Sequence, residues 1–181
     1  LGFDEILLKN ADGRNQKAAA LLKEQKETGS VSVSETDRIL QIQTNGCSYV
    51  YDKFSGLFRQ ISIGGADQLD APMEWNIWRA PTDNDRRIKV DWIAAGYDRS
   101  HSRVYATEWA EQNGKIQIHS RLSIAAVALQ KVLEIDEVWE ISGEGTLSVK
   151  MKVRKDMEFP QLPRFGIRLF LKGEYETLRF Y

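Results

Sequence analysis

The chain has 181 residues, 42% of them hydrophobic, and its 25 basic and 26 acidic side chains leave a formal net charge of −1. This is an ordinary globular composition, and its balanced charge argues against a surface built for nucleic acid or anionic lipid. The longest apolar run, Ile124 to Leu129, is too short to cross a bilayer and the single Cys47 excludes an internal disulfide, so we expect a protein of the reducing cytoplasm.

The first thirty residues differ in pattern from the rest. Phe3 to Leu8 is a short apolar run that predicts a strand. Asn15 to Thr28 has high helix propensity and ends at Gly29, but its apolar stripe is narrow, and an isolated helix of this length is marginal in water. We interpret residues 10–30 as a linker that is helical in part at best.

From Val31 onward the hydrophobic pattern has a period of two, which is typical of strands with one buried face. The alternating apolar positions are Leu40 and Ile42; Ile61 and Ile63; Ile116, Ile118, Leu122 and Ile124; Leu129, Leu133, Ile135, Trp139 and Ile141; Leu147, Val149, Met151 and Val153; and Phe165, Ile167, Leu169 and Leu171. Glycine-containing turns separate them. This spacing predicts an all-β fold, a large antiparallel β-sandwich. The one convincing helix is short, from Val90 to Ala95, with Gly96 as its C-terminal cap.

The stretch from Trp75 to Asp85, WNIWRAPTDND, is the most informative part of the chain. Aromatic faces beside fixed carboxylate and amide acceptors suit sugar recognition, because a pyranose stacks its apolar face on indole while its hydroxyls need several hydrogen-bond partners. The alternative is structural, with Trp75 and Trp78 in the core of an edge strand and a solvated proline turn after them. Chemistry alone favours this alternative, and Trp78 is the better candidate for an exposed ring.

Two carboxylates in this stretch, Asp83 and Asp85, have roughly the spacing of a retaining glycosidase pair, about 5–5.5 Å. Nothing apolar flanks them to raise one pKa into the range of a general acid, and Arg79, Arg86 and Arg87 nearby would lower both. We therefore reject them as catalytic residues. We expect instead that Arg79 pairs with Asp85 and holds the proline turn, which is a scaffold role.

The residues that could bind metal are few. His101 and His119 are the only histidines, and His119 lies at an alternating strand position that is typical of a sheet surface. The Asp83-Asn84-Asp85 sequence lacks the glycine and the distal glutamate of a calcium loop. We expect no metal site in this chain.

Residues 79–85, RAPTDND, resemble the R-A-P-x-D-N-D signature that opens the C-terminal domain of family-2 glycoside hydrolases of the β-galactosidase type. Residues 49–57, YVYDKFSGL, resemble the first hairpin of that domain. Residues 92–96, WIAAG, and residues 162–167, LPRFGI, resemble its W-x-x-A-G segment and its P-R-x-G strand. All four matches occur in the order of the family.

The resemblance implies the fold and the division of the chain. The fifth, small-chain domain of the family is a galactose-mutarotase-like supersandwich, and residues 31–181 would be its N-terminal part. Residues 1–9 would be the last strand of a preceding immunoglobulin-like domain, and residues 10–30 the linker. The sandwich would be truncated at its C-terminus, since the strand expected near Tyr181 leads into further strands in the family.

The resemblance also implies a function. The intact protein would be a retaining β-galactosidase that hydrolyses terminal β-D-galactosides such as lactose. The catalytic glutamates and the Mg and Na ligands of the family lie in other domains, so this fragment would have no catalytic residue and would be inactive alone. It would border the active site, with the pocket rim formed by Trp78, Arg79, Asp83, Asn84 and Asp85. Its partners would be the remaining domains or a separate large chain, the galactoside, and further copies in an oligomer.

Two other functions fit the residues less well. The first is a stand-alone carbohydrate-binding module without hydrolase activity, which would use Trp78, Asp83, Asn84 and Asp85. The second is a mutarotase-like enzyme of the same fold. That chemistry needs a histidine and a glutamate converging on one sugar ring, and the two histidines of this chain lack the matching context.

Overall fold

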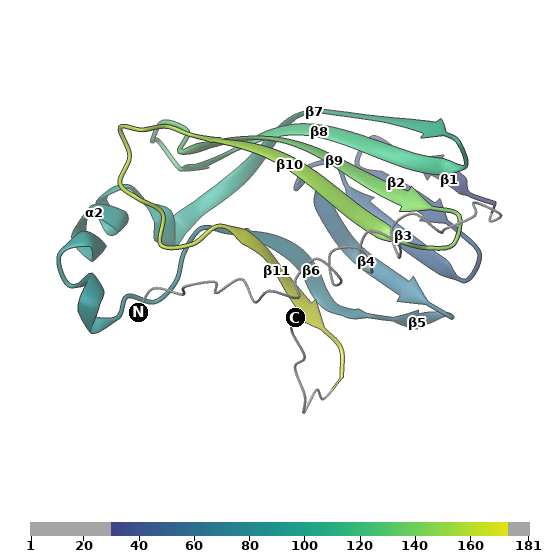
Figure 1. Ribbon diagram of the computed structural model, residues 1–181, viewed down its shortest axis with the longest axis horizontal. Coiled ribbons are helices and arrows are strands. Elements are labelled where there is room, and N and C mark those ends of the chain that lie inside the picture. The colour runs from purple at the N-terminus through teal and green to yellow at the C-terminus, as the bar shows by residue number, and fades with distance from the viewer. Residues whose placement is uncertain (1–29, 174–181) are drawn as a thin grey trace, which may run out of the picture.

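The computed structural model describes residues 30–173, which form two packed β layers (Figure 1). One layer is a four-stranded antiparallel sheet in the order β10-β9-β8-β7. The other contains a five-stranded sheet in the order β1-β2-β3-β4-β5 and a two-stranded sheet of β11 and β6. The all-β sandwich predicted from the sequence is confirmed.

The elements have the following bounds. The five-stranded sheet contains β1 Ser32–Glu35, β2 Ile39–Gln43, β3 Cys47–Asp52, β4 Leu57–Ile63 and β5 Ala66–Asp67. The four-stranded sheet contains β7 Ser100–Gln112, β8 Lys115–Ala126, β9 Leu133–Ser142 and β10 Leu147–Lys155. The two-stranded sheet pairs β6 Leu69–Asn76 with β11 Gly166–Leu171. Three short helices lie between β6 and β7: the 3-10 turn η1 Asp83–Asp85, the helix α2 Ile88–Ala94 and the 3-10 turn η2 Tyr97–Arg99.

The predicted short helix is confirmed as α2, which begins at Ile88 rather than Val90, with Gly96 in the left-handed conformation after it. None of the helices within residues 30–173 is long and apolar enough to cross a membrane. The strand expected in residues 1–9, the helix expected in the linker and the strand expected near Tyr181 lie outside the described residues.

The strand predictions need correction in three places. In β4, Ile63 was expected on a buried face but is 54% exposed, whereas its neighbour Ser62 is buried. The alternation from Phe165 to Leu171 predicted one buried face, but Leu169 and Leu171 are about half exposed. The register of β11 against β6 shifts after Arg168, so an irregularity in the pairing breaks the alternation. The longest strand, β7, was not predicted, because its inward positions include small and polar residues such as Ser102 and Thr107.

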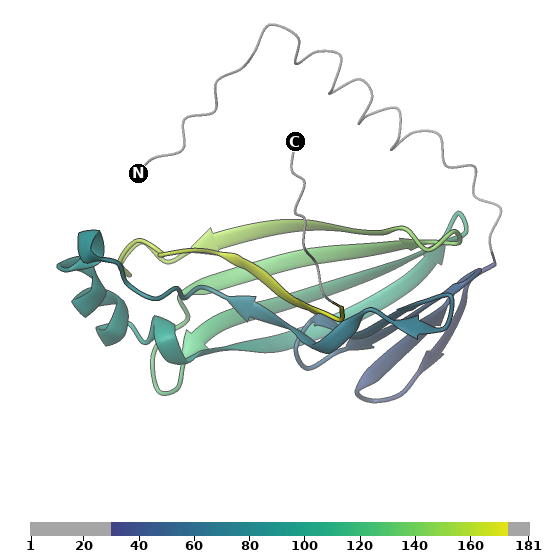
Figure 2. The same cartoon turned by 90° about the horizontal axis from the view of Figure 1, so that it is seen from below.

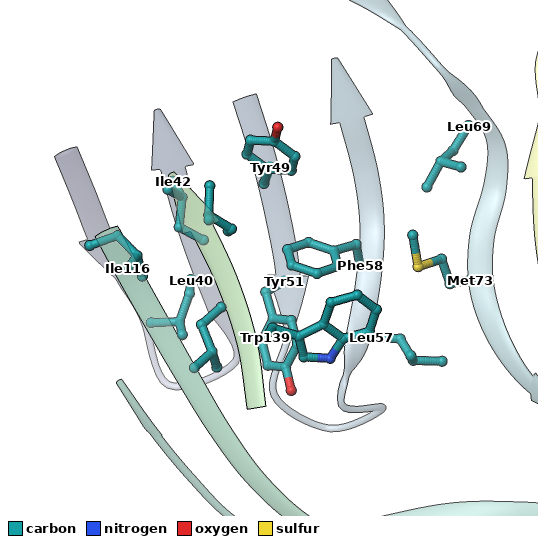
Figure 3. Close-up of a cluster of buried hydrophobic side chains, with 12 residues drawn as sticks. Leu40, Ile42, Tyr49, Tyr51, Leu57, Phe58, Leu69, Met73, Ile116 and Trp139 are labelled. Atoms are coloured by element: carbon teal, nitrogen blue, oxygen red, sulfur yellow. The ribbon is translucent and has the colours of Figure 1, made fainter. Parts of the chain in front are cut away.

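The interior consists of two hydrophobic cores that lie under different halves of the long sheet. The sandwich core packs β2, β3, β4 and β6 against the first half of β8 and the second half of β9 (Figure 3). Its members are Leu40, Ile42, Tyr49, Tyr51, Leu57, Phe58, Leu69, Met73, Ile116, Ile118, Trp139 and Ile141. The end core packs the helical segment against the other half of the sheet. Its members are Ile77, Trp92, Ala95, Tyr97, Leu122, Ile124, Val132, Leu133 and Ile135.

Aromatic rings form the centre of the sandwich core. Phe58 is fully buried and meets Tyr51 and Trp139 edge-on, with ring centroids 5.2 and 5.1 Å apart. Edge-to-face contacts of this kind add about 0.5–1.5 kcal/mol per pair to the gain from burying the rings. Figure 3 shows these rings between the two layers.

A polar seam separates the two cores, and we define it as Tyr51, Thr107, Ser120 and Glu137. Ser120 and Glu137 are directly paired across β8 and β9. The Tyr51 hydroxyl donates to Glu137 Oε1 at 3.1 Å and lies 2.7 Å from Ser120 Oγ, which in turn lies 2.9 Å from Thr107 Oγ1. Glu137 is fully buried, and this burial raises its pKa to about 8.

A glycine allows the first hairpin to lie against this seam. Gly56 has φ +74°, and a Cβ atom built there would lie 2.9 Å from Glu137 Oε1 and 3.0 Å from Leu122 Cδ2. A larger residue would therefore meet both the backbone cost of positive φ and an overlap. The glycine of the YVYDKFSGL hairpin is thus required by packing as well as by the turn.

Candidate functional site

The WNIWRAPTDND stretch begins at the end of β6 and turns away from the sheet. Asn76 is the last residue of β6, and its side-chain Oδ1 accepts a hydrogen bond from the backbone N–H of Trp78 at 3.0 Å. This is a local turn that ends the strand. Ile77, between them, is buried in the end core, so the chain is anchored where it leaves the sheet.

Arg79 and Asp85 form a two-pronged ion pair, as the sequence predicted. Arg79 Nη1 lies 2.5 Å from Asp85 Oδ2, and Arg79 Nη2 lies 2.9 Å from Asp85 Oδ1. The Asp85 carboxylate also accepts from the backbone N–H and the hydroxyl of Thr82, at 2.8 and 2.9 Å. Hydrogen bonds from Arg79, reinforced by those from Thr82, hold the pKa of Asp85 well below its usual range.

Arg79 connects this turn to distant parts of the chain. Its Nε donates to the carbonyl oxygen of Pro163 at 3.3 Å, and its guanidinium carbon lies 5.3 Å from the centre of the Trp92 ring. A planar guanidinium can make all these contacts at once because its donors are fixed in a fork and its face can stack on an indole. Arg79 is therefore engaged by a carboxylate, a backbone carbonyl and an aromatic ring, while 31% of its side chain stays exposed.

Two further side chains bind the same distant loop. Trp92 Nε1 donates to the carbonyl oxygen of Gln161 at 2.8 Å, and the Tyr97 hydroxyl donates to that of Pro160 at 2.7 Å. Both rings are buried in the end core, and burial raises the pKa of Tyr97 to about 12. Together with Arg79, they connect the helical segment to residues 160–163, and we call these three contacts the loop clamp.

The loop clamp explains why three of the sequence matches occur together. The RAPTDND, WIAAG and LPRFGI segments are distant in sequence but belong to one contact network in space. Gly96 of the second segment has φ +72°, and a Cβ atom there would lie 2.5 Å from the Cβ of Ala126. The segment can approach β8 this closely only because the residue is glycine.

The five predicted rim residues divide into three groups. Arg79 and Asp85 are engaged with each other, and Asp85 is buried. Trp78 is half-buried and meets Trp92 edge-on at 6.3 Å, so its ring is covered in part rather than fully presented. Asp83 and Asn84 are exposed, and their side chains make no hydrogen bond to any described residue.

This arrangement does not supply a general acid from the Asp83 and Asp85 pair, since Asp85 is held ionised by Arg79 and Thr82. His119 lies on the exposed face of β8 with its Nε2 2.9 Å from Asp136 Oδ1, which agrees with the predicted sheet-surface position. Among residues 30–173 no group of three or more His, Cys, Asp or Glu side chains is placed to hold a metal ion. Sequence reasoning missed the clamp residues Trp92 and Tyr97, because their acceptors are backbone carbonyls.

Comparison with known proteins identifies relatives along the whole chain. Residues 43–181 match the family described as "Beta galactosidase small chain". The chain is 30% identical to a beta-galactosidase of Actinobacillus pleuropneumoniae and 29% identical to one of Staphylococcus xylosus, over 100% of its own length in both cases. A beta-galactosidase of Pseudoalteromonas haloplanktis is 25% identical over 96% of the chain. The chain spans about 18% of the length of the first two relatives.

Proposed function

This chain belongs to the beta-galactosidase small-chain family, and on that premise we propose that its parent protein is a retaining family-2 β-galactosidase acting on terminal β-D-galactosides such as lactose. The support is the match over most of the chain and the beta-galactosidase relatives that align with all of it. We propose that residues 31–181 belong to the small-chain sandwich, that residues 1–9 end a preceding domain and that residues 10–30 link the two.

Within that enzyme, we propose that this segment is a non-catalytic scaffold bordering the sugar pocket. The observation that carries this proposal is the division of the predicted rim. Arg79 and Asp85 bind each other and fix the short turn between them. Asp83 and Asn84 lie on this turn with their side chains exposed. A carboxylate and an amide held this way can accept and donate hydrogen bonds to sugar hydroxyls.

Catalysis would then rest on the rest of the parent protein. A retaining mechanism needs one carboxyl group as nucleophile and another as acid and base, and the described residues present no suitable pair at the candidate site. We propose that the Mg and Na ligands also lie outside this chain, that the isolated chain is inactive, and that its partners are the remaining domains or large chain within a cytoplasmic oligomer.

Kinetics of the parent enzyme test the rim assignment. Asp83→Ala and Asn84→Ala should each raise KM for an aryl β-galactoside about three- to tenfold, the effect of losing one hydrogen bond to a substrate. Asp70→Ala, an exposed aspartate on β6, is the matched control and should leave KM unchanged. An unchanged KM in both rim variants would show that these side chains do not touch substrate.

Assays of the isolated chain test whether catalysis requires the rest of the parent protein. It should not hydrolyse the same substrate, whereas turnover by the purified chain would place catalytic groups within it. The second candidate, a carbohydrate-binding module, is favoured by the exposed Asp83 and Asn84 beside Trp78. Saturable galactose binding by the chain, lost on Asp83→Ala without any hydrolase in the parent, would support the module instead.

A further inference from the structure

A hollow of about 550 Å³ opens on the outer face of the four-stranded sheet, where β7 begins and β8 ends. It lies between β7 and the loop of residues 127–132, which Figure 2 shows in green at one end of the long sheet. None of the rim residues 78–85 lines it. Its volume lies within the range of small-molecule sites, about 300–1,000 Å³. We call this site the β7 hollow, and its lining includes His101, Arg103, Tyr105, Ser123, Val127 and Lys131.

The strand register shows which side chains face the β7 hollow. Leu122 is buried in the end core, so its neighbour Ser123 points to the opposite, outer face of the sheet. Arg103 is paired with Ser123 across β7 and β8, and His101 lies two residues before it, so both side chains share that outer face. The hydroxyl of Tyr105 lies 2.9 Å from Ser123 Oγ, which places Tyr105 there as well.

Two irregularities of the backbone shape the β7 hollow. The pairing of β7 with β8 shifts at Tyr105, and this bulge brings the Tyr105 ring beside Arg103, whose guanidinium carbon lies 5.5 Å from the ring centre. In the loop, Ala128 has φ +63°, a conformation that alanine rarely adopts, and its neighbour Val127 is 77% exposed. Bulges re-aim side chains next to binding sites, and strained residues cluster there.

The lining of the β7 hollow is basic. Arg103, Lys131 and His101 line it, and none of the described acidic residues does. Lys131 is paired with Glu134, which lies behind the lining. Arg103 forms no ion pair with a described residue, and its stacking on Tyr105 leaves the N–H donors at the edge of the guanidinium available. A planar guanidinium can bind two oxygens of a carboxylate or a phosphate at once.

We propose that the β7 hollow binds a small organic oxyanion, a carboxylate or a phosphate monoester, with its charged group on Arg103 and its apolar body against Val127 and Tyr105. Both of these side chains are more than half exposed, so covering them with a ligand gains free energy. A cationic ligand is disfavoured by Arg103 and Lys131. The proposal concerns binding only and does not rest on the hydrolytic function proposed for the parent protein.

Proton NMR of the 181-residue chain tests this binding directly, because its two histidines share the outer face of the sheet. His119 lies six residues along β8 from Ala125, the partner of His101, which separates the two rings by about 20 Å. At constant pH and ionic strength, phenyl phosphate or benzoate should shift the His101 signals saturably, with a dissociation constant on the order of 1 mM. The His119 signals, assigned by their loss in a His119→Gln variant, should stay in place.

Three variants separate the charged contact from the apolar contact. Arg103→Gln removes the guanidinium and should weaken the binding of phenyl phosphate about tenfold. Arg121→Gln makes the same change on the same face but outside the lining, so it should change the affinity by less than about twofold. Val127→Ser should weaken phenyl phosphate about threefold and leave the weaker binding of inorganic phosphate unchanged. All three side chains are exposed, so the fold should survive, as the circular dichroism spectrum would confirm.

Four outcomes would overturn the proposal: no saturable His101 shift with either oxyanion, equal shifts at both histidines, equal losses of affinity in Arg103→Gln and Arg121→Gln, or inorganic phosphate binding as tightly as phenyl phosphate. The last result would mean an adventitious ion only. Benzyl alcohol, which has the apolar ring without the charge, should cause no saturable shift, and binding as tight as that of benzoate would contradict the role of Arg103.

The comparison of phenyl phosphate with benzoate identifies the preferred charged group. Tighter binding of either one supports the proposal and shows whether the site selects phosphate or carboxylate. Since the titration involves no hydrolysis, an inactive parent enzyme would leave its result standing, and a failed titration would leave the proposed function untouched.

Discussion

The two halves of the long sheet β7–β10 are covered in different ways. The sandwich core is covered by strands whose apolar side chains alternate, so its stability comes from buried area spread over many residues. The end core is covered by a short helix and two loops, joined by the Arg79, Trp92 and Tyr97 contacts of the loop clamp. The stability of the sandwich core therefore depends on how completely its apolar side chains fill the interior. The stability of the end core depends on a few directed hydrogen bonds and close contacts.

The largest effect should come from the sandwich core. Phe58→Ala removes the central ring of the aromatic cluster and should lower the free energy of unfolding by about 4 kcal/mol, the usual cost of a large core cavity. Urea denaturation measures the loss. Phe54→Ala, in a side chain that is 65% exposed, is the control and should change stability by less than about 0.5 kcal/mol.

The next largest effect on stability should come from the close contact between Gly96 and Ala126 in the end core. Gly96→Ala should cost about 3 kcal/mol, because the new Cβ meets both a positive φ and the Ala126 Cβ at 2.5 Å. Gly64→Ala shares the positive φ but has open space around it, so it should cost about 1 kcal/mol. Equal losses in thermal unfolding would show that β8 and the helical segment are not in tight contact.

The polar seam between the cores should make stability depend on pH. The folded-state pKa of Glu137 is raised to about 8 from 4.5, so the folded chain binds more protons than the unfolded chain between these values. Stability from this group is therefore fully present below pH 4.5 and declines toward pH 8, by at most about 1.4 kcal/mol per pH unit. Above pH 8 the slope from this group should disappear.

Glu137→Gln tests the source of that slope. The variant keeps the shape of the side chain but cannot ionise, so its stability relative to the unmodified chain should rise steadily with pH across the window. Urea midpoints at several pH values measure the difference. A constant difference between the two proteins would show that Glu137 is not the group that titrates.

The smallest effect should come from one contact of the loop clamp. Tyr97→Phe removes only the hydroxyl that donates to Pro160, so it should cost about 1 kcal/mol with little change in packing. Hydrogen exchange should show faster opening of residues 159–163 and unchanged protection of β2–β4. A uniform loss of protection in both regions would mean that the two cores unfold as one unit.

The sequence predicted the sandwich core better than the end core. Strands such as β8 and β9 alternate strictly because one face is wholly buried, and Glu137 was hidden in that alternation as a charged residue at a buried position. The strand β7 escaped prediction because its inward face includes serine and threonine. The strand β11 was predicted, but its face is not buried as expected, because an irregular register moves Leu169 to the surface. A search for alternating apolar residues cannot detect an inward face that carries polar residues, or an irregular strand register.

The candidate site was predicted to the extent that its contacts are local. Arg79 and Asp85 lie within one turn, so their pairing followed from charge and spacing. Trp92 and Tyr97 bind backbone carbonyls of a loop far along the chain. Every residue has a backbone carbonyl, so the residue types do not indicate which one accepts the hydrogen bond. For the same reason, the sequence alone did not show that Arg79 also binds the carbonyl oxygen of Pro163.

Hydrogen exchange of two neighbouring aspartate variants tests most directly whether this stretch is a scaffold. Asp85→Asn removes the charge that pairs with Arg79, whereas Asp83→Asn makes the same chemical change on an exposed side chain. Asp85→Asn should increase exchange in residues 78–97 and 159–163 together, and Asp83→Asn should leave both segments as protected as before. Equal exchange in the two variants would contradict the proposal that the Arg79–Asp85 pair holds this end of the molecule together.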